Sequence, residues 1–227
     1  MNLAIFDIDG TLTLGTSHFK VFVAALESTC GFQNVSANWN DYHHPSDSGI
    51  VDQVSHQQLG RSLTDDELER FKGEYLARLR EACCVAHAVP GAAEFLATLE
   101  GDGKWALAYA TGNWRATGRC KLASAGLPSE TFPLSGAEDG PSRVQILQMA
   151  IEKSQAHWGV ASFQRIVSFG DALWDLGAAR DLGLPFVGLD TMDRGSEMLS
   201  AGTSHLLPDF TDLSQAMLAL NEARAPH

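Results

Sequence analysis

The stretch Ile5–Thr13, which reads IFDIDGTLT, decides the fold of this chain. The apolar residues 3–6 predict a buried strand that ends at Asp7, and Asp9 follows two positions later. A glycine and a threonine then turn the chain out of the sheet. Two carboxylates at the end of one strand are costly to bury unless a cation lies between them, and Mg²⁺ accepts such oxygen ligands. The alternative is an ordinary strand followed by an Asp-Gly turn with two solvated acids.

A second predicted strand ends in a hydroxyl group and bare backbone amides. The apolar run Trp105–Ala110 predicts this strand, and the sequence TGN follows it directly. The Thr111 hydroxyl and nearby amides can hold phosphate oxygens, and Gly112 lets the backbone come close to them. Thr111 is also a suitable N-cap for a following helix. The two roles are compatible because helix N-termini attract anions.

A third predicted strand end is again acidic. Residues 165–169 read RIVSF and predict a strand, and the sequence GDALWD comes directly after it. This spacing places Asp171 at the edge of the sheet and Asp175 one helical turn later. Beside the acids of the first strand, these two would complete an oxygen-rich site for Mg²⁺, with water as the remaining ligands. A capped helix alone is the other explanation of this pattern.

These three segments resemble motifs of the haloacid dehalogenase superfamily. IFDIDGTLT matches the first motif, DxDGT(L/V)T, while TGN and GDALWD match the second and the fourth. The resemblance implies that Asp7 is a nucleophile and that Asp9 is an acid/base. The implied Mg²⁺ ligands are Asp7, Asp9, Asp171 and Asp175, the last directly or through a water, and the implied phosphate-binding residues are Thr111, Gly112 and Arg143.

Arg143 matches the third motif of that family, a single basic residue before the last helix–strand unit. It opens a predicted amphipathic helix that leads toward the strand at 166–169. The family usually has lysine here, but a guanidinium can also neutralise carboxylate and phosphoryl oxygens, with stricter geometry. Lys121 and Lys104 are the substitutes for this role. An ordinary solvated arginine in the first turn of a helix is the alternative.

The order of the segments predicts an α/β fold with an inserted helical region. Helical patterns fill residues 15–86, including a capping box at Thr64–Glu67, and parallel-sheet strands resume at 105–110, 166–169 and 185–189. The carboxyl ends of such strands meet at one edge of the sheet. We therefore expect a Rossmann-like, doubly wound parallel sheet core. By resemblance to the family, residues 1–14 and 87–227 form this core domain, and residues 15–86 form an inserted α-helical cap domain.

The resemblance implies an enzyme, a Mg²⁺-dependent phosphatase that hydrolyses a small phosphate monoester through an aspartyl-phosphate. Asp9 favours an oxygen leaving group, because the family's dehalogenases need neither this acid nor Mg²⁺. A phosphosugar mutase using the same aspartyl-phosphate is one alternative. A non-catalytic binding protein on the same scaffold is another, although every motif position retains a chemically competent residue.

Specificity is expected from the cap, which closes over the leaving group in this family. The polar, aromatic segment 41–50 is predicted to lie between cap helices and offers His43, His44, Asp47 and Ser48 to a polar substrate. The alternative for each of these side chains is a solvated interhelical loop. Two tryptophans beside the motifs, Trp114 and Trp174, either form a wall of the site or pack in the core.

Composition excludes several classes of partner. The 227 residues carry a formal net charge of −12, which argues against nucleic acid as a partner. No apolar stretch approaches the roughly 20 residues of a membrane span, and a strand that begins at Leu3 leaves no room for a signal peptide. Four cysteines without disulfide spacing suit a reduced compartment. We expect a cytoplasmic protein whose partner is a small phosphorylated metabolite, and the sequence leaves monomer or dimer open.

Overall fold

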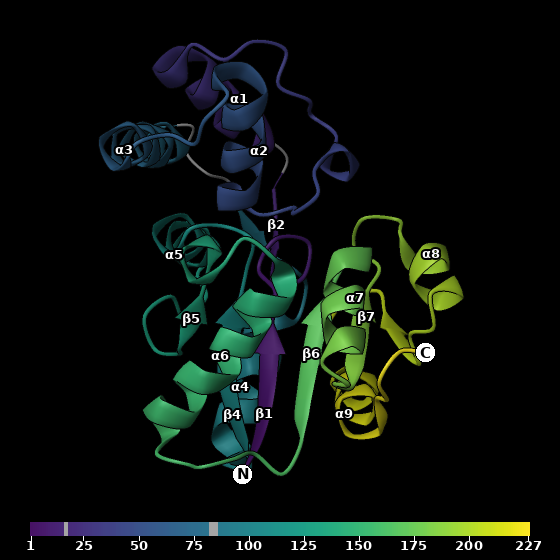
Figure 1. The fold of residues 1–227 in the computed structure, drawn as a ribbon. Helices are drawn as coiled ribbons and strands as arrows, with labels where there is room; N and C mark the ends of the chain where they lie inside the picture. The colour runs from purple at the N-terminus through teal and green to yellow at the C-terminus, as the bar shows by residue number, and fades with distance from the viewer. Residues whose placement is uncertain (16–17, 82–85) are drawn as a thin grey trace.

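The computed structural model describes residues 1–15, 18–81 and 86–227, and its centre is a parallel sheet of six strands (Figure 1). The strand order is β5-β4-β1-β6-β7-β8. The strands are β1 (Asn2–Phe6), β4 (Trp105–Ala110), β5 (Leu134–Ser135), β6 (Ile166–Gly170), β7 (Phe186–Leu189) and β8 (His205–Leu207). All five neighbouring pairs are parallel. The three main strands predicted from the sequence are therefore present within one or two residues of their expected bounds.

Strand β1 lies in the middle of the sheet and is buried on both faces. Leu3 and Ile5 face one apolar cluster, whereas Ala4 and Phe6 face another. The alternation follows from the two-residue period of a strand, and apolar residues on both sides are typical of a parallel sheet covered by helices. The chain moves from β1 to one side of the sheet and later crosses to the other, which creates a crevice at the end of β1.

Helices cover both faces of the sheet. The first face packs against α4 (Ala92–Asp102), α5 (Arg115–Ser124) and α9 (Leu213–Glu222). The second packs against α6 (Arg143–Trp158) and α7 (Leu173–Asp181), which lie in front of the sheet in Figure 1. A short helix, α8 (Gly195–Ser200), packs beside β7 and β8. The predicted Rossmann-like α/β fold is confirmed.

A helical insert, defined here as residues 18–81, interrupts this pattern after β1. It contains α1 (His18–Cys30), the 3-10 turn η1 (Trp39–Asp41), α2 (Asp47–Leu59) and α3 (Asp65–Glu81). The insert lies beyond the carboxyl ends of the strands (Figure 1). An antiparallel pair, β2 (Thr13–Leu14) and β3 (His87–Ala88), joins it to the sheet region. The predicted capping box at the start of α3 is present, because Thr64 and Glu67 exchange side-chain to backbone hydrogen bonds of 2.8 and 3.3 Å.

The insert has its own apolar core, and that core extends to the sheet region. Phe22 of α1, Val54 of α2 and Phe71 of α3 belong to one cluster of buried residues. Trp114 and Ala137, which come from loops of the sheet region, belong to the same cluster. The insert is therefore packed against the ends of the strands through apolar contacts.

One local expectation was wrong: the polar segment 41–50 is only half a loop. Helix α2 begins at Asp47, and Ser46 caps it by accepting a hydrogen bond from the Gly49 backbone N–H. Serine is a favoured N-cap, so the polar residues that suggested a loop instead start a helix. Of the four cysteines, Cys30 and Cys120 are free thiols, and the adjacent pair at 83–84 lies outside the described residues. Among the described helices, none is long and apolar enough to cross a membrane.

Candidate active site

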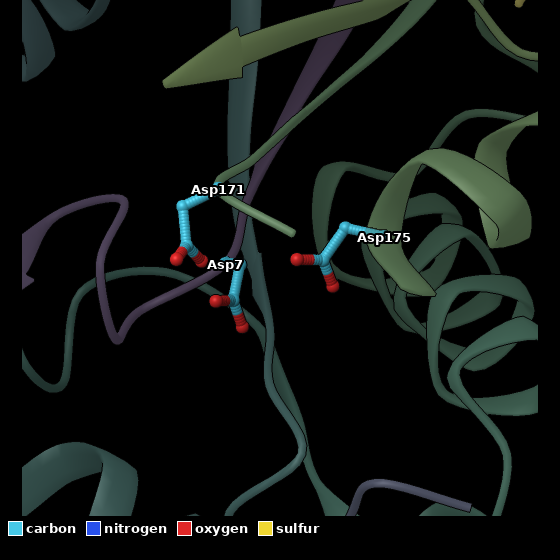
Figure 2. A group of neighbouring side chains, drawn as sticks. All are labelled: Asp7, Asp171 and Asp175. Carbon is cyan, nitrogen blue, oxygen red and sulfur yellow. The ribbon is translucent and has the colours of Figure 1, made fainter. Parts of the chain in front are cut away.

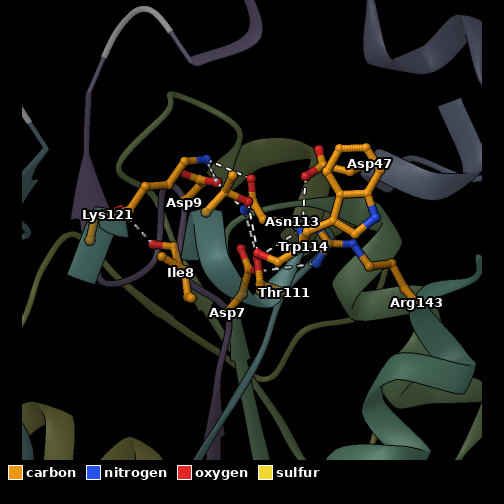
Figure 3. Close-up of polar contacts among 11 residues, drawn as sticks. Asp7, Ile8, Asp9, Asp47, Thr111, Asn113, Trp114, Lys121 and Arg143 are labelled. Carbon is orange, nitrogen blue, oxygen red and sulfur yellow. Dashed lines mark hydrogen bonds and ion pairs between the residues drawn. The ribbon is translucent and has the colours of Figure 1, made fainter. Parts of the chain in front are cut away.

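The polar residues predicted from the sequence meet at the carboxyl edge of the sheet. Asp7 follows β1, Thr111 follows β4 and Asp171 follows β6. Because β4 and β6 both pair with β1, the three side chains come from neighbouring strands that end at the same edge. Figure 2 and Figure 3 show how these side chains approach one another.

Three carboxylates form a compact group at this edge. One oxygen from each of Asp7, Asp171 and Asp175 lies within 4.8 Å of the others, and all three residues are buried (Figure 2). Burial is the largest cause that raises the pKa of each of the three to about 7. Their mutual repulsion raises each pKa further, while Arg143 lowers it. The three carboxylates are thus harder to ionise together unless a further positive charge lies beside them.

The donor set of this group fits a hard divalent cation. Mg²⁺ favours oxygen ligands and usually keeps several bound waters. The three carboxylates at the edge of the sheet offer only oxygen atoms. Asp175 also has a buried oxygen, Oδ2, with no hydrogen-bond partner among the described residues. A buried carboxylate oxygen without a partner is unfavourable, and a cation would satisfy it. Asp7, Asp171 and Asp175 are therefore the residues that could hold a metal ion.

Gly10 makes room for this acidic group. Its φ of +77° lies in the left-handed region, and an added Cβ would overlap the carboxylate of Asp171. Both observations require glycine at this position. The Gly10 carbonyl also accepts a hydrogen bond from the Thr191 hydroxyl, which ties the turn after β1 to the loop after β7.

Arg143 places a cation beside the same carboxylates. It opens α6, and its guanidinium Nη1 lies 3.1 Å from Asp7 Oδ1 and 3.7 Å from an oxygen of Asp175. Burial alone would lower the pKa of Arg143, but Asp175 and Asp7 raise it above its usual range. Its Nε is buried and has no partner among the described residues.

The other two candidate cations lie elsewhere. Lys104 is exposed and pairs with Asp102. Lys121 reaches a different acid, Asp9. Arg143 is therefore the cation that contacts Asp7, as the sequence pattern suggested.

Asp9 is held by two donors and lies outside the group of three acids. Lys121 Nζ donates to Asp9 Oδ2 at 2.6 Å, and Asn113 Nδ2 donates to the same oxygen at 2.6 Å (Figure 3). Lys121 also donates to Asn113 Oδ1 at 2.7 Å, which closes the network. Lys121 is 1% exposed, whereas the Asp9 side chain is 40% exposed and faces the cavity. The sequence placed Asp9 among the metal ligands, but the structure directs its carboxylate toward a cation of the protein.

Sequence reasoning assigned no role to Asn113 and named Lys121 only as a substitute for Arg143. One signal was available. Thr117, Gly118 and Leu122 are buried on α5, and Lys121 shares that face at helical spacing. A lysine on a buried helix face needs an anionic partner.

Thr111 is fully buried, and none of the described residues accepts its hydroxyl proton. Its Oγ1 accepts hydrogen bonds from the Asn113 side chain at 2.8 Å and from the Asn113 backbone N–H at 3.2 Å. Both contacts use the lone pairs of the hydroxyl, so its O–H remains a donor. Gly112, the next residue, lies against Arg143 and Pro45, whose Cζ and carbonyl oxygen would each be 2.9 Å from an added Cβ.

Of the four insert residues predicted to contact a substrate, Asp47 lines the cavity above the acids, whereas His43, His44 and Ser48 are not part of its described lining. Asp47 Oδ2 accepts a hydrogen bond of 2.8 Å from the Trp114 backbone N–H. Its own N–H donates to the Gly112 carbonyl at 2.7 Å. Burial raises the pKa of Asp47 to about 7, although Lys121 acts in the opposite direction. Ser48 instead donates to the Ala137 carbonyl and ties α2 to the sheet region.

A cavity of about 540 Å³ lies between the strand ends and the insert. We call its charged wall the floor: Asp7, Asp9, Lys121, Arg143 and Asp171. We call its apolar wall, which comes mainly from the insert, the roof: Leu14, Phe19, Phe22, Trp39, Tyr75, Trp174 and Met192. A volume of this size holds a whole small molecule rather than a phosphate group alone, since ligand cavities run from roughly 300 to 1,000 Å³.

Known proteins provide independent comparisons. The family model for haloacid dehalogenase-like hydrolases matches residues 1–183. No curated protein matches the sequence. A hydrolase from Pseudomonas syringae has a similar structure, with 23% identity, a TM-score of 0.67, and coverage of 96% of this chain and 98% of that one.

Two further solved structures show the same fold. A predicted phosphoglycolate phosphatase from Haemophilus somnus is 21% identical, with a TM-score of 0.63 and coverage of 96% of this chain and 98% of that one. CbbY from Rhodobacter sphaeroides, solved in complex with phosphate, is 20% identical, with a TM-score of 0.68 and coverage of 94% and 96%.

Proposed function

The chain belongs to the haloacid dehalogenase-like hydrolases, and from that premise we propose that it is a phosphatase. It hydrolyses a small phosphate monoester with Asp7 as nucleophile and a divalent metal, Mg²⁺, as cofactor. The observation that carries the proposal is the position of Asp7. Its carboxylate lies at the floor of the cavity, next to the Arg143 guanidinium and to two further acids.

The residues that hold the metal in this proposal are Asp7, Asp171 and Asp175. When bound, the ion supplies positive charge that offsets the repulsion between these acids and a phosphoryl group. Arg143 adds a second positive charge, since its guanidinium lies 3.1 Å from Asp7 and 3.7 Å from Asp175. Its unpartnered Nε supports this role, because a phosphoryl oxygen would satisfy that donor.

In the first step, an oxygen of Asp7 attacks phosphorus and the bond from phosphorus to the leaving oxygen breaks. Asp9 donates a proton to that oxygen, so an alcohol leaves and an aspartyl-phosphate remains on Asp7. The Thr111 hydroxyl donates a hydrogen bond to a phosphoryl oxygen, and the Gly112 backbone lies close to that oxygen. These contacts hold the phosphoryl group in line with the attacking carboxylate.

In the second step, Asp9 removes a proton from a water molecule as the water attacks phosphorus. The bond from phosphorus to Asp7 breaks, and inorganic phosphate leaves. Asp9 must then alternate between the two protonation states from one fixed position. We propose that Lys121 and Asn113 are positioning residues for Asp9, because both donate to its Oδ2 and so fix the direction of its carboxylate at the cavity.

We propose that the helical insert acts as a cap domain, spanning residues 15–86, over a core domain of residues 1–14 and 87–227. The apolar packing of Trp114 against the insert and the hydrogen bonds of Asp47 and Ser48 to core loops support this division. A cap in this place excludes bulk water from the aspartyl-phosphate. It also contacts the leaving group, which gives it control over specificity.

Release of inorganic phosphate from para-nitrophenyl phosphate tests the proposal. We expect release with Mg²⁺ and loss of release when EDTA is added. Asp7→Asn should abolish it while circular dichroism and thermal melting show a folded protein. If no phosphate ester is hydrolysed with any divalent metal, the proposed function is wrong and a binding role on this scaffold takes its place.

A further inference from the structure

The roof of the cavity differs in chemistry from what a sugar phosphate needs. Four aromatic side chains of the insert line the cavity, namely Phe19, Phe22, Trp39 and Tyr75. The acidic side chain that the insert adds, Asp47, already accepts a hydrogen bond from the Trp114 backbone. The insert therefore offers a mostly apolar surface to whatever group extends upward from the phosphate.

The aromatic wall continues across the boundary between the insert and the sheet region. The rings of Phe19 and Trp39 have centroids 4.3 Å apart, and those of Trp39 and Trp174 are 6.4 Å apart. Trp39 belongs to the insert, whereas Trp174 lies within the motif after β6. The Arg194 guanidinium lies 5.3 Å from the centroid of Trp174 and supports that ring from beside the floor. Two elements far apart in the sequence thus build one continuous aromatic surface.

The phosphate and the leaving group must divide the cavity between them. In the proposed function the phosphate lies at the floor beside Asp7 and Arg143, so the rest of the ester extends toward the roof. Removal of apolar surface from water stabilises the complex, and contacts between aromatic rings stabilise it further. A hydroxyl group that is buried without a hydrogen-bond partner destabilises the complex. One face of a sugar can pack on a tryptophan, but the hydroxyls at its rim would need donors and acceptors from this roof.

We propose that the preferred substrate is a phosphate monoester of an aryl or arylalkyl alcohol, rather than of a sugar or of glycolate. This inference rests on the proposed function and adds the chemical class of the leaving group. Trp39 and Trp174 contact the aromatic group, while the ring of Phe19 packs against Trp39. The reaction is unchanged, with the alcohol leaving as Asp7 takes the phosphoryl group.

The test compares esters of similar intrinsic reactivity. The substrates 2-phenylethyl phosphate, glycerol 3-phosphate and glucose 6-phosphate are all esters of primary alcohols, so differences in kcat/KM report recognition rather than leaving-group strength. We expect kcat/KM for the phenylethyl ester to exceed that for either polyol ester by about tenfold or more. A kcat/KM for a polyol ester equal to or above that of the phenylethyl ester overturns the inference and leaves the phosphatase activity in place.

Substitutions of Trp39 test whether the roof causes the preference for the phenylethyl ester. Trp39→Ala should lower the ratio of kcat/KM between the phenylethyl and glycerol esters by about tenfold, chiefly through KM for the phenylethyl ester. Trp39→Leu, which keeps an apolar side chain, provides the second variant if the alanine protein is unstable. Leu59→Ala, an exposed position of α2 in the same insert, is the matched control and should leave the ratio unchanged. If the ratio of kcat/KM between the two esters is unchanged in both Trp39 variants, the roof does not select the substrate and the inference is wrong.

Binding without turnover separates this inference from the proposed function. 3-Phenylpropylphosphonate and 3,4-dihydroxybutylphosphonate imitate the phenylethyl and glycerol esters but cannot be hydrolysed. We expect the phenyl compound to raise Tm more than the diol at equal concentration, and Trp39→Leu to reduce that difference. Failure of hydrolysis with every ester refutes the phosphatase, while an equal or larger shift with the diol refutes the apolar substrate class.

Discussion

The floor of the cavity is lined by charged side chains, whereas the roof is lined by apolar and aromatic ones. On the floor, Asp7 and Asp171 are buried acids close to each other and to the Arg143 guanidinium, and such groups are costly to bury as charges unless they are paired. On the roof, the ring of Phe19 contacts that of Trp39, and Trp39 in turn lies beside Trp174. In the proposed function, the chemical step therefore takes place at the strand ends, and selectivity comes from the insert. Changes on the floor should thus alter catalysis by orders of magnitude, and changes on the roof should alter selectivity and stability by less.

The largest effect should come from Asp7→Asn. The amide is a poor nucleophile, so kcat should fall by roughly a thousandfold or more. A kcat assay with para-nitrophenyl phosphate measures the loss, and the thermal melt of the variant checks its fold. Wild-type turnover by this variant would show that Asp7 is not the nucleophile.

Removal of the metal should have the next largest effect and should depend on pH. Burial raises the pKa of the three floor acids to about 7 in the folded protein, above their value in the unfolded chain. Their protons are therefore held more tightly in the folded state. The stability that these protons provide is complete below about pH 4 and is lost as the pH rises through about 7.

Addition of Mg²⁺ should compensate for this loss. Thermal melts after EDTA treatment should show Tm falling between pH 5 and pH 8, and saturating Mg²⁺ should raise Tm more at pH 8 than at pH 5. Asp171→Asn should reduce the response to Mg²⁺. A rise in Tm of equal size at both values of pH would contradict a site built from these acids.

Lys121→Met should have an intermediate effect, because Lys121 acts through Asp9. The methionine fills the same space but leaves Asp9 with one donor fewer, so kcat should fall by roughly 10- to 100-fold with a smaller change in KM. An alkyl phosphate should be affected more than para-nitrophenyl phosphate, since a good leaving group needs less help from an acid. Lys104→Met, at an exposed lysine on the same sheet region, is the control. Equal losses for both esters would indicate a purely structural role.

Asp47→Asn should have the smallest effect, and the effect should be on stability. Burial raises the pKa of Asp47 to about 7, so the wild-type protein holds a buried charge above that pH. The amide stays neutral and its oxygen can still accept from the Trp114 backbone. Tm should therefore rise in the variant at pH 8 and change little at pH 5, by about 2–4 °C for each kcal/mol of stability recovered.

The control for this prediction lies on the same helix. Asp52→Asn changes an exposed acid of α2 and should show no comparable dependence on pH. A variant at position 47 that is less stable than the wild type at pH 8 would show that the ionised carboxylate stabilises the boundary between the insert and the core.

The sequence was a good guide to the floor because strand ends have a fixed geometry. Asp7, Thr111 and Asp171 each follow an apolar run, and parallel strands bring such positions to one edge. Arg143 was also placed correctly, since it opens a helix of clear period. The sequence was a poorer guide where side-chain direction decides the contact. Asp9 was grouped with Asp7 as a metal ligand, whereas its carboxylate accepts a hydrogen bond from Lys121, a partner 112 positions away in the chain.

The roof was largely beyond sequence reasoning. Trp174 was offered by the sequence as a wall of the site, and it does line the cavity. The other aromatic residues lie outside the motifs, so only the tertiary packing of the insert reveals that they face the same cavity. The polar residues of segment 41–50 suggested a substrate-binding loop, but Ser46 caps a helix and Ser48 bonds to the Ala137 carbonyl. Polar side chains near a helix start often serve the backbone, and composition alone does not distinguish this from a role in binding.

Trapping the phosphorylated enzyme tests the account most directly. In an Asp9→Asn variant, para-nitrophenyl phosphate should still phosphorylate Asp7, because its leaving group needs no acid, but the water step should stall. Rapid quenching followed by peptide mass spectrometry should then find one phosphoryl group on Asp7, together with a burst of nitrophenolate equal to the enzyme concentration. Steady release of nitrophenolate with no phosphoryl group on Asp7 would contradict the account.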